Sequence, residues 1–206
     1  MQSDWSVACG ADDPMVVVPW AGISRVNEEG PIRFIDLREE PARIDKIPEA
    51  ASHPCVAAAL RRWNQQDSPL FTAKCDVWDY PADLFDAEDL EGFPFAQGSY
   101  IDLLSRDPKF FSNFSLCERR LRDWSERARA IELSDGRCEW TLRSGRIFPE
   151  AVDSVNPSAT DAHIDGFATT LYVWGYGSSG EAAARAWSSA LLALIEPVLS
   201  PKCEIR

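Results

Sequence analysis

The sequence's most recognisable chemical pattern is a glycine motif. Gly175, Gly177 and Gly180 have the spacing G-x-G-x-x-G that cradles dinucleotide phosphates. A dinucleotide fold also needs a further parallel strand, with an acidic residue about 20 positions on, and a single helical segment follows here. The pattern therefore favours a turn and a helix start, with Ser178 and Glu181 as a capping box. Exposed N–H groups there are also a candidate anion site, comprising Gly177, Ser178, Ser179 and Gly180.

A second pattern has metal-ligand chemistry. Asp161, His163 and Asp165 alternate, so an extended backbone would place all three on one face. Imidazole and two carboxylates form a plausible ligand set for a divalent metal. A metal-dependent hydrolase centred on these residues is the alternative function, and no other cofactor is expected. The competing interpretation is a solvent-exposed loop with local hydrogen bonds.

The third pattern is aromatic, in a chain of 206 residues with eight tryptophans. Tyr172, Trp174 and Tyr176 alternate with Leu171 and Val173, so the rings share one face of a strand. A sheet face lined with rings can stack ligands or pair with a second copy of the chain. In the competing interpretation, the first 50 residues cover this face. The candidate ligand-binding residues are Trp78, Tyr80, Tyr172, Trp174 and Tyr176.

Residues 81–91 form an acidic loop. Loops of this length often carry function, and the sequence lacks the order of a calcium-binding loop. The simplest interpretation is a solvated loop, and as a functional element it would be a docking surface for a basic partner. Its acidic residues are Asp83, Asp86, Glu88, Asp89 and Glu91.

Composition excludes several classes of partner. The chain has 21 basic and 33 acidic residues, a formal charge of −12, which disfavours nucleic acid and anionic membranes. A basic protein, a cation or a neutral small molecule is easier to accommodate. The N-terminal residues lack the pattern of a secretory signal, so we expect a cytoplasmic protein. The six cysteines contain no C-x-x-C pair, which indicates reduced structural thiols rather than zinc ligands.

Periodicity and turn residues predict the elements that must position these groups. Helices are expected at 54–65 after an N-cap at Ser52, at 115–131 from a Ser115–Glu118 capping box, and at 180–199. An irregular connection is expected at 39–54. Strands are expected at 15–20, 32–37, 71–80, 98–105, 138–142 and 166–177.

The resulting fold class is α+β, with a largely antiparallel sheet and helices on one face. The inner elements fit a ferredoxin-like βαββαβ core, extended by a C-terminal strand and helix. We expect a single domain over 1–206, in which an irregular segment, 1–50, packs one or two strands on the core. The expected function is a non-enzymatic binding or protein-interaction module. It would use the aromatic face or the acidic loop to bind a protein or small molecule.

Overall fold

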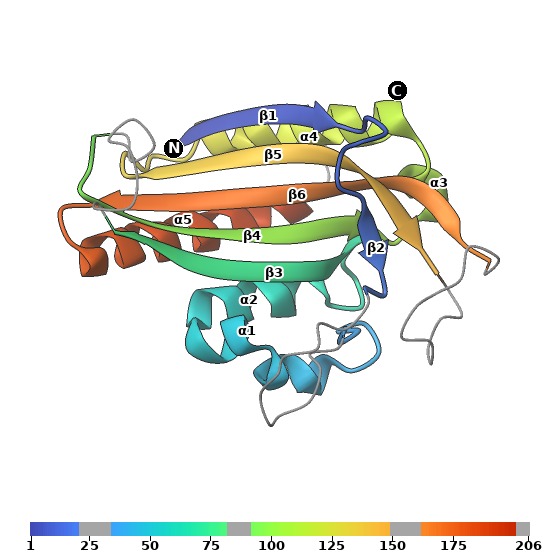
Figure 1. Cartoon of the computed structure of the whole chain (residues 1–206), viewed down its shortest axis with the longest axis horizontal. Helices are drawn as coiled ribbons and strands as arrows, with labels where there is room; N and C mark the ends of the chain where they lie inside the picture. Colours follow the sequence, from blue (N-terminus) through green and yellow to red (C-terminus); the bar gives the residue numbers. More distant parts are fainter. Residues whose placement is uncertain (21–33, 82–91, 149–161, 201–206) are drawn as a thin grey trace.

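Six strands form one mixed sheet in a computed structural model that describes residues 1–20, 34–81, 92–148 and 162–200 (Figure 1). The strands are β1 (Gln2–Ala8), β2 (Val16–Val18), β3 (Leu70–Pro81), β4 (Phe95–Ser105), β5 (Gly136–Ile147) and β6 (Ile164–Gly177). Their order is β1-β5-β6-β4-β3, with β2 also beside β5. The α+β class and the mostly antiparallel sheet are therefore confirmed. The single-domain boundaries stay a prediction.

The finer ferredoxin-like plan is not confirmed. β3, β4, β6 and β5 pair antiparallel in that spatial order, whereas β1 and β2 both pair parallel with β5. The edge strand β1 was not expected, because its inward positions are not all apolar. Ser3 faces the core, where its Oγ lies 3.0 Å from Ser125 Oγ and accepts a 3.1 Å hydrogen bond from Trp140 Nε1.

The strand expected at 32–37 is wrong for its described part. Asp36 forms a turn there: its side chain accepts a 2.9 Å hydrogen bond from the Arg38 N–H, and its carbonyl accepts from Glu39 and Glu40. Such local acceptors compete with sheet pairing. The irregular connection expected at 39–54 contains the 3₁₀-helix η1 (Pro41–Lys46) and the helix α1 (Pro48–Ser52).

Three helices cover one face of the sheet: α2 (Pro54–Trp63), α4 (Phe114–Arg129) and α5 (Gly180–Leu199). Figure 1 shows α4 and α5 behind the strands. Four tryptophans are buried in this layer, at 2% exposure or less, and their indole N–H groups all donate hydrogen bonds. Half of the unusual tryptophan content is therefore core: Trp63, Trp124, Trp140 and Trp187.

The glycine motif brings α5 close to β6. A Cβ at Gly175 would lie 1.9 Å from the Trp187 amide nitrogen, and one at Gly177 would lie 2.5 Å from that of Ala183. Neither position tolerates a side chain without displacing the helix. The first two glycines are thus explained by helix–strand packing. Gly180 begins the helix, and a Cβ there would meet nothing within 4 Å.

Helix starts differ from the expected caps by one or two residues. The N-cap of α5 is Ser179, whose Oγ accepts a 3.2 Å hydrogen bond from the Ala182 N–H, so Ser178 was the wrong choice. The N-cap of α4 is Asn113 rather than Ser115, and its Oδ1 accepts from the Leu116 N–H at 3.1 Å. Ser52 ends α1, and α2 begins after His53.

By length and composition, α5 could cross a membrane. In the structure it packs along β6 and buries Trp187, Leu191 and Leu194 against the sheet, as a core helix does. The packing of α5 therefore does not indicate a membrane span. That the protein does not bind membranes stays a prediction.

Candidate functional site

The opposite face of the sheet divides into two halves. At one end, β2 lies across the strands, and Val16 and Val18 pack on Phe71, Leu104 and Ala168. The short helix α3 (Pro108–Phe111) adds Phe111 to this cluster. In Figure 1, β2 lies in front of the other strands, near the start of β6. The competing expectation, that the N-terminal segment covers this face, thus holds for this half.

The other half carries a row of half-buried rings. Trp78 and Tyr100 have centroids 6.0 Å apart, Tyr100 and Tyr172 are 6.0 Å apart, and Tyr172 stacks on Trp174 at 5.7 Å and 12°. We call these four residues the ring row. It runs from β3 over β4 to β6, on the face opposite Leu171 and the other core residues.

Gly98 makes room for the two indoles. It pairs with Trp78 on one side and Trp174 on the other. A Cβ at Gly98 would lie 2.7 Å from Trp78 Nε1 and 3.1 Å from Trp174 Cδ1. The absent side chain therefore lets both indoles lean over the backbone of β4.

A polar network lies beside the rings. Asp102 is 7% exposed, and its Oδ1 accepts a 2.7 Å hydrogen bond from Thr170 Oγ1. Arg143 joins the network, donating from Nε to Thr170 Oγ1 at 3.1 Å and from Nη2 to the Tyr172 hydroxyl at 2.9 Å. Lys74 places its ammonium 6.0 Å from the centroid of Tyr100. The network holds Tyr172 in place.

Burial changes the acidity of two groups here. It raises the pKa of Asp102 to about 6, although the Thr170 hydrogen bond and the charges of Arg143 and Lys74 oppose the change. Burial, with the negative charges of Asp102 and Asp76, also raises the pKa of Tyr100. The Asp102 carboxyl group therefore changes charge near neutral pH. Groups with shifted pKa values are enriched at functional sites.

Carboxylates bracket the two tyrosines of the ring row. In register across the sheet, Glu139 pairs with Tyr172, Tyr172 with Tyr100, and Tyr100 with Asp76. The Asp76 carboxylate accepts a 2.8 Å hydrogen bond from the Val77 N–H. Among the described residues, neither Asp76 nor Glu139 forms an ion pair. Asp76 on β3 and Glu139 on β5 therefore flank the pair of tyrosines, one on each side.

The predicted aromatic residues are only partly brought together. Trp78, Tyr172 and Trp174 belong to the ring row, whereas Tyr176 is 6% exposed and stacks on Phe93 at 5.8 Å. The side chain of Tyr80 lies outside the described residues. Sequence reasoning missed Tyr100, Asp102, Thr170 and Arg143. The signal was an acidic residue, Asp102, between the apolar Ile101 and Leu103 of β4, on the same face as Tyr100.

The expected metal residues are only partly described, because Asp161 is outside the described ranges. His163 Nε2 lies 3.4 Å from Asp165 Oδ2. Asp165 Oδ1 forms an ion pair with Arg146, accepting a 2.7 Å hydrogen bond from its Nε. No three potential metal ligands come together in the part of the chain that the structure describes. The metal site stays a prediction. Its described residue on β6, Asp165, lies at the start of the strand, whereas the ring-row residues Tyr172 and Trp174 lie in its second half.

Three other expectations are located as follows. The acidic loop falls on 82–91, outside the described residues. At the candidate anion site, the Ser179 side chain and carbonyl are used by the Ala182 and Ala183 N–H groups. The five described cysteines are free thiols, and burial raises the pKa of Cys117 and Cys138 to about 11, as suits structural thiols.

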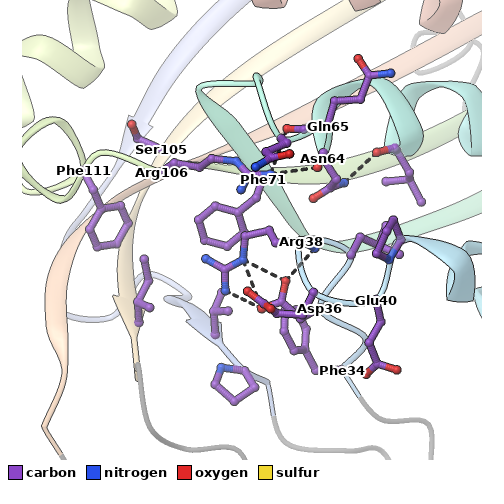
Figure 2. A pocket seen from close by; sticks show the side chains of 18 of the residues that line it. Phe34, Asp36, Arg38, Glu40, Asn64, Gln65, Phe71, Ser105, Arg106 and Phe111 are labelled. Carbon is purple, nitrogen blue, oxygen red and sulfur yellow. Dashed lines mark hydrogen bonds and ion pairs between the residues drawn. The ribbon is translucent and has the colours of Figure 1, made fainter.

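A large cavity lies at the β2 end of the molecule, away from the indoles. Its volume is about 1260 Å³, and Figure 2 shows residues that line it. The lining comes from the end of β2, residues 34–44, the last turn of α2, α3 and the adjoining strand ends. Phe34, Phe71 and Phe111 contribute apolar surface, and Arg38 and Arg106 contribute charge. Sequence reasoning did not indicate this cavity.

Comparisons with protein-family models, with curated proteins and with solved structures find no match to this chain. The functional argument therefore depends on the geometry of the sites.

Proposed function

We propose that this chain is a non-enzymatic binding protein, and that the ring row is the surface on which a basic partner protein docks. The observation that carries the proposal is the row Glu139–Tyr172–Tyr100–Asp76, in which half-buried rings lie between two carboxylates. Lysine and arginine side chains are attracted both to ring faces and to carboxylates. Trp78 and Trp174 extend the same surface along the strands.

The electrostatics favour a cationic partner over other ligands. The formal charge of −12 attracts basic surfaces over long range and raises association rates. On the ring row itself, Lys74 already lies over Tyr100. A cation at this ring is therefore compatible with the local field. Arg143 is held by Thr170 and Tyr172, so it supports the surface rather than extending from it.

The shape of the surface favours a protein over a small molecule. The rings lie side by side across three strands, which is a broad platform rather than a deep pocket. Interfaces between proteins are enriched in tyrosine, tryptophan and arginine, which concentrate binding energy at a few positions. A partner would cover the rings and leave Asp76 and Glu139 at the rim.

The test uses a short peptide of alternating glycine and lysine, with a glycine–glutamate peptide as its charge control. We expect the lysine peptide to shift the NMR signals of the Trp78 and Trp174 indoles, and the glutamate peptide to leave them unchanged. Trp174→Ala should weaken binding about tenfold, the effect of losing roughly 1.4 kcal/mol at one aromatic contact.

A matched control removes an exposed ring elsewhere. Phe114, 39% exposed, contacts Phe167 away from the ring row, and Phe114→Ala should bind the lysine peptide as tightly as the unchanged protein. Unchanged affinity in both variants would show that the peptide follows net charge alone, and equal losses in both would show that the ring row is not specific. Either result, or shifts confined to other surfaces, would overturn the proposal.

A further inference from the structure

The cavity at the β2 end offers a binding site distinct from the ring row. It has an apolar wall made of Val18, Phe34, Phe71, Phe111, Ile147 and Ile164. Small-molecule sites typically enclose about 300–1,000 Å³ and combine apolar walls with a few fixed polar groups. At about 1260 Å³, this cavity has room for such a ligand. Figure 2 shows Phe71 and Phe111 on one side, with Arg38 and Asp36 beneath them.

One of the two arginines is neutralised within the cavity. Arg38 donates to Asp36 from Nε at 2.8 Å and from Nη2 at 2.5 Å, and its guanidinium lies 4.0 Å from the centroid of Phe71. Burial alone would raise the pKa of Asp36, but Arg38, and to a lesser degree Arg106, hold it below its ordinary value. Asp36 is therefore ionised and committed to Arg38.

The partners of the other arginine among the described residues are all neutral. Arg106 donates from Nε to the Leu70 carbonyl at 3.0 Å, and from Nη2 to the carbonyls of Asn64 at 2.8 Å and Gln65 at 3.1 Å. No carboxylate among the described residues lies within ion-pair distance of it. Burial and then the charge of Arg38 lower the pKa of Arg106, although Asp36 and Glu39 act in the opposite sense. Its charge is therefore incompletely compensated.

The remaining charges of the lining lie at its exposed rim. Glu40 forms an ion pair with Arg43 at 2.8 Å, and Glu39 and Arg61 are exposed to solvent. Among the described residues inside the cavity, two guanidinium groups face one carboxylate. One further negative charge would balance these groups.

We propose that this cavity binds a small amphipathic monocarboxylate. Its apolar body lies against Phe71, Phe111 and Val18, and its carboxylate accepts hydrogen bonds from Arg106 beside Arg38. Because Nε and Nη2 of Arg106 donate to backbone carbonyls, the carboxylate binds at Nη1 through charge-assisted hydrogen bonding. A doubly charged phosphate ester fits less well, because Asp36 would repel the second charge. For an amine, the carboxylate that the described residues place inside the cavity, Asp36, is already paired with Arg38.

The first test compares three probes of equal chain length on the unchanged protein: octanoate, octan-1-ol and octylamine. Titration calorimetry should show octanoate binding at least tenfold more tightly than the alcohol, and octylamine more weakly still. Equal binding of octanoate and the alcohol would show an apolar groove without charge recognition. That result, tighter binding of the amine, or no binding of octanoate overturns the proposal.

The second test locates the carboxylate. Arg106→Gln should weaken octanoate binding by about 10- to 100-fold, because hydrogen bonds to charged groups contribute about 1.5–3 kcal/mol. Arg119→Gln, an exposed change on α4, serves as the charge-matched control and should leave binding unchanged.

A third variant covers the case in which Arg106→Gln fails to fold, since Arg106 ties the end of α2 to β3. Ile147→Trp narrows the cavity at its half-buried wall and keeps both arginines. It should weaken octanoate binding while the folded protein retains its circular dichroism spectrum. Undiminished binding in this variant would place the octanoate elsewhere and overturn the assignment.

Discussion

Thr170 Oγ1 lies 2.7 Å from Asp102 Oδ1, and this hydrogen bond joins the adjacent strands β6 and β4 beside the ring row. It satisfies one oxygen of a carboxyl group that is almost fully buried. Burial of an ionised carboxylate costs stability, which the hydrogen bond only partly offsets. Asp102 is therefore a residue whose charge weakens the fold at neutral pH.

The first prediction is that Asp102→Asn stabilises the protein at about pH 7.5. The pKa of Asp102 in the folded state, about 6, lies above its ordinary value of 3.8, so the folded protein binds the proton more tightly than the unfolded chain. Its stability contribution is thus fully present below pH 3.8 and is lost as the pH rises through 6. Asparagine resembles the protonated form, and the gain should be about 1–3 kcal/mol.

Urea unfolding at two pH values checks this. The gain from Asp102→Asn should be present at about pH 7.5 and absent near pH 3.5. Asp76→Asn, a change at an exposed carboxylate on the same face, should alter stability little at either pH. A gain of the same size at both pH values would show that ionisation of Asp102 is not its source.

The second prediction concerns partner binding on the ring row and rests on the proposed function. A cationic partner favours the ionised form of Asp102, so binding of the lysine peptide should weaken as the pH falls through about 6. In Asp102→Asn, this step should disappear from the affinity measured between about pH 5 and 7. A step that persists in the variant would assign it to another group.

The third prediction separates the glycines of the G-x-G-x-x-G motif. Gly175→Ala should destabilise the protein by about 3 kcal/mol or more, since the new Cβ would lie 1.9 Å from the Trp187 backbone and α5 would have to move. Gly180→Ala should be neutral or stabilising by up to about 1 kcal/mol, because its Cβ meets nothing and alanine favours helix. Thermal unfolding of both variants measures the difference. A phosphate-binding role predicts no such contrast in stability.

The fourth prediction tests the helix starts. Ser179→Ala should cost about 1 kcal/mol through loss of the N-cap of α5, whereas Ser178→Ala should cost less than about 0.5 kcal/mol. Asn113→Ala and Ser115→Ala form the corresponding pair for α4. Chemical denaturation of the four variants checks the assignment, and a larger cost at Ser178 or Ser115 would contradict it.

Local periodicity predicted the elements whose apolar residues repeat regularly. The stripe of Cys117, Leu121, Trp124 and Ala128 gave α4, and all four residues are buried. The alternation around Leu171 and Val173 gave β6 and the face of its rings. These signals are strong because one side of each element is packed against the core.

Long-range features were beyond that reasoning. β1 pairs with β5 across more than 130 residues, and its inward Ser3 carries no apolar signal. The segment at 34–37 looks like a strand, but hydrogen bonds to Asp36 make it a turn. The network of Asp102, Thr170 and Arg143 depends on register between three strands. The cavity depends on five or more separate segments meeting, which no local pattern records.

The absence of a side chain at Gly98 also affects the fluorescence of the protein. It lets the indoles of Trp78 and Trp174 lie half-exposed on the surface, whereas four other tryptophans are shielded in the core. Light absorbed by the shielded indoles is emitted from an apolar environment, and light from this pair is emitted beside water. A quencher dissolved in the buffer will therefore reach this pair, together with the half-buried Trp5 and Trp20, before the core indoles. A docked partner will shield the pair, so a decrease in quenching can follow occupancy of this face without any added label.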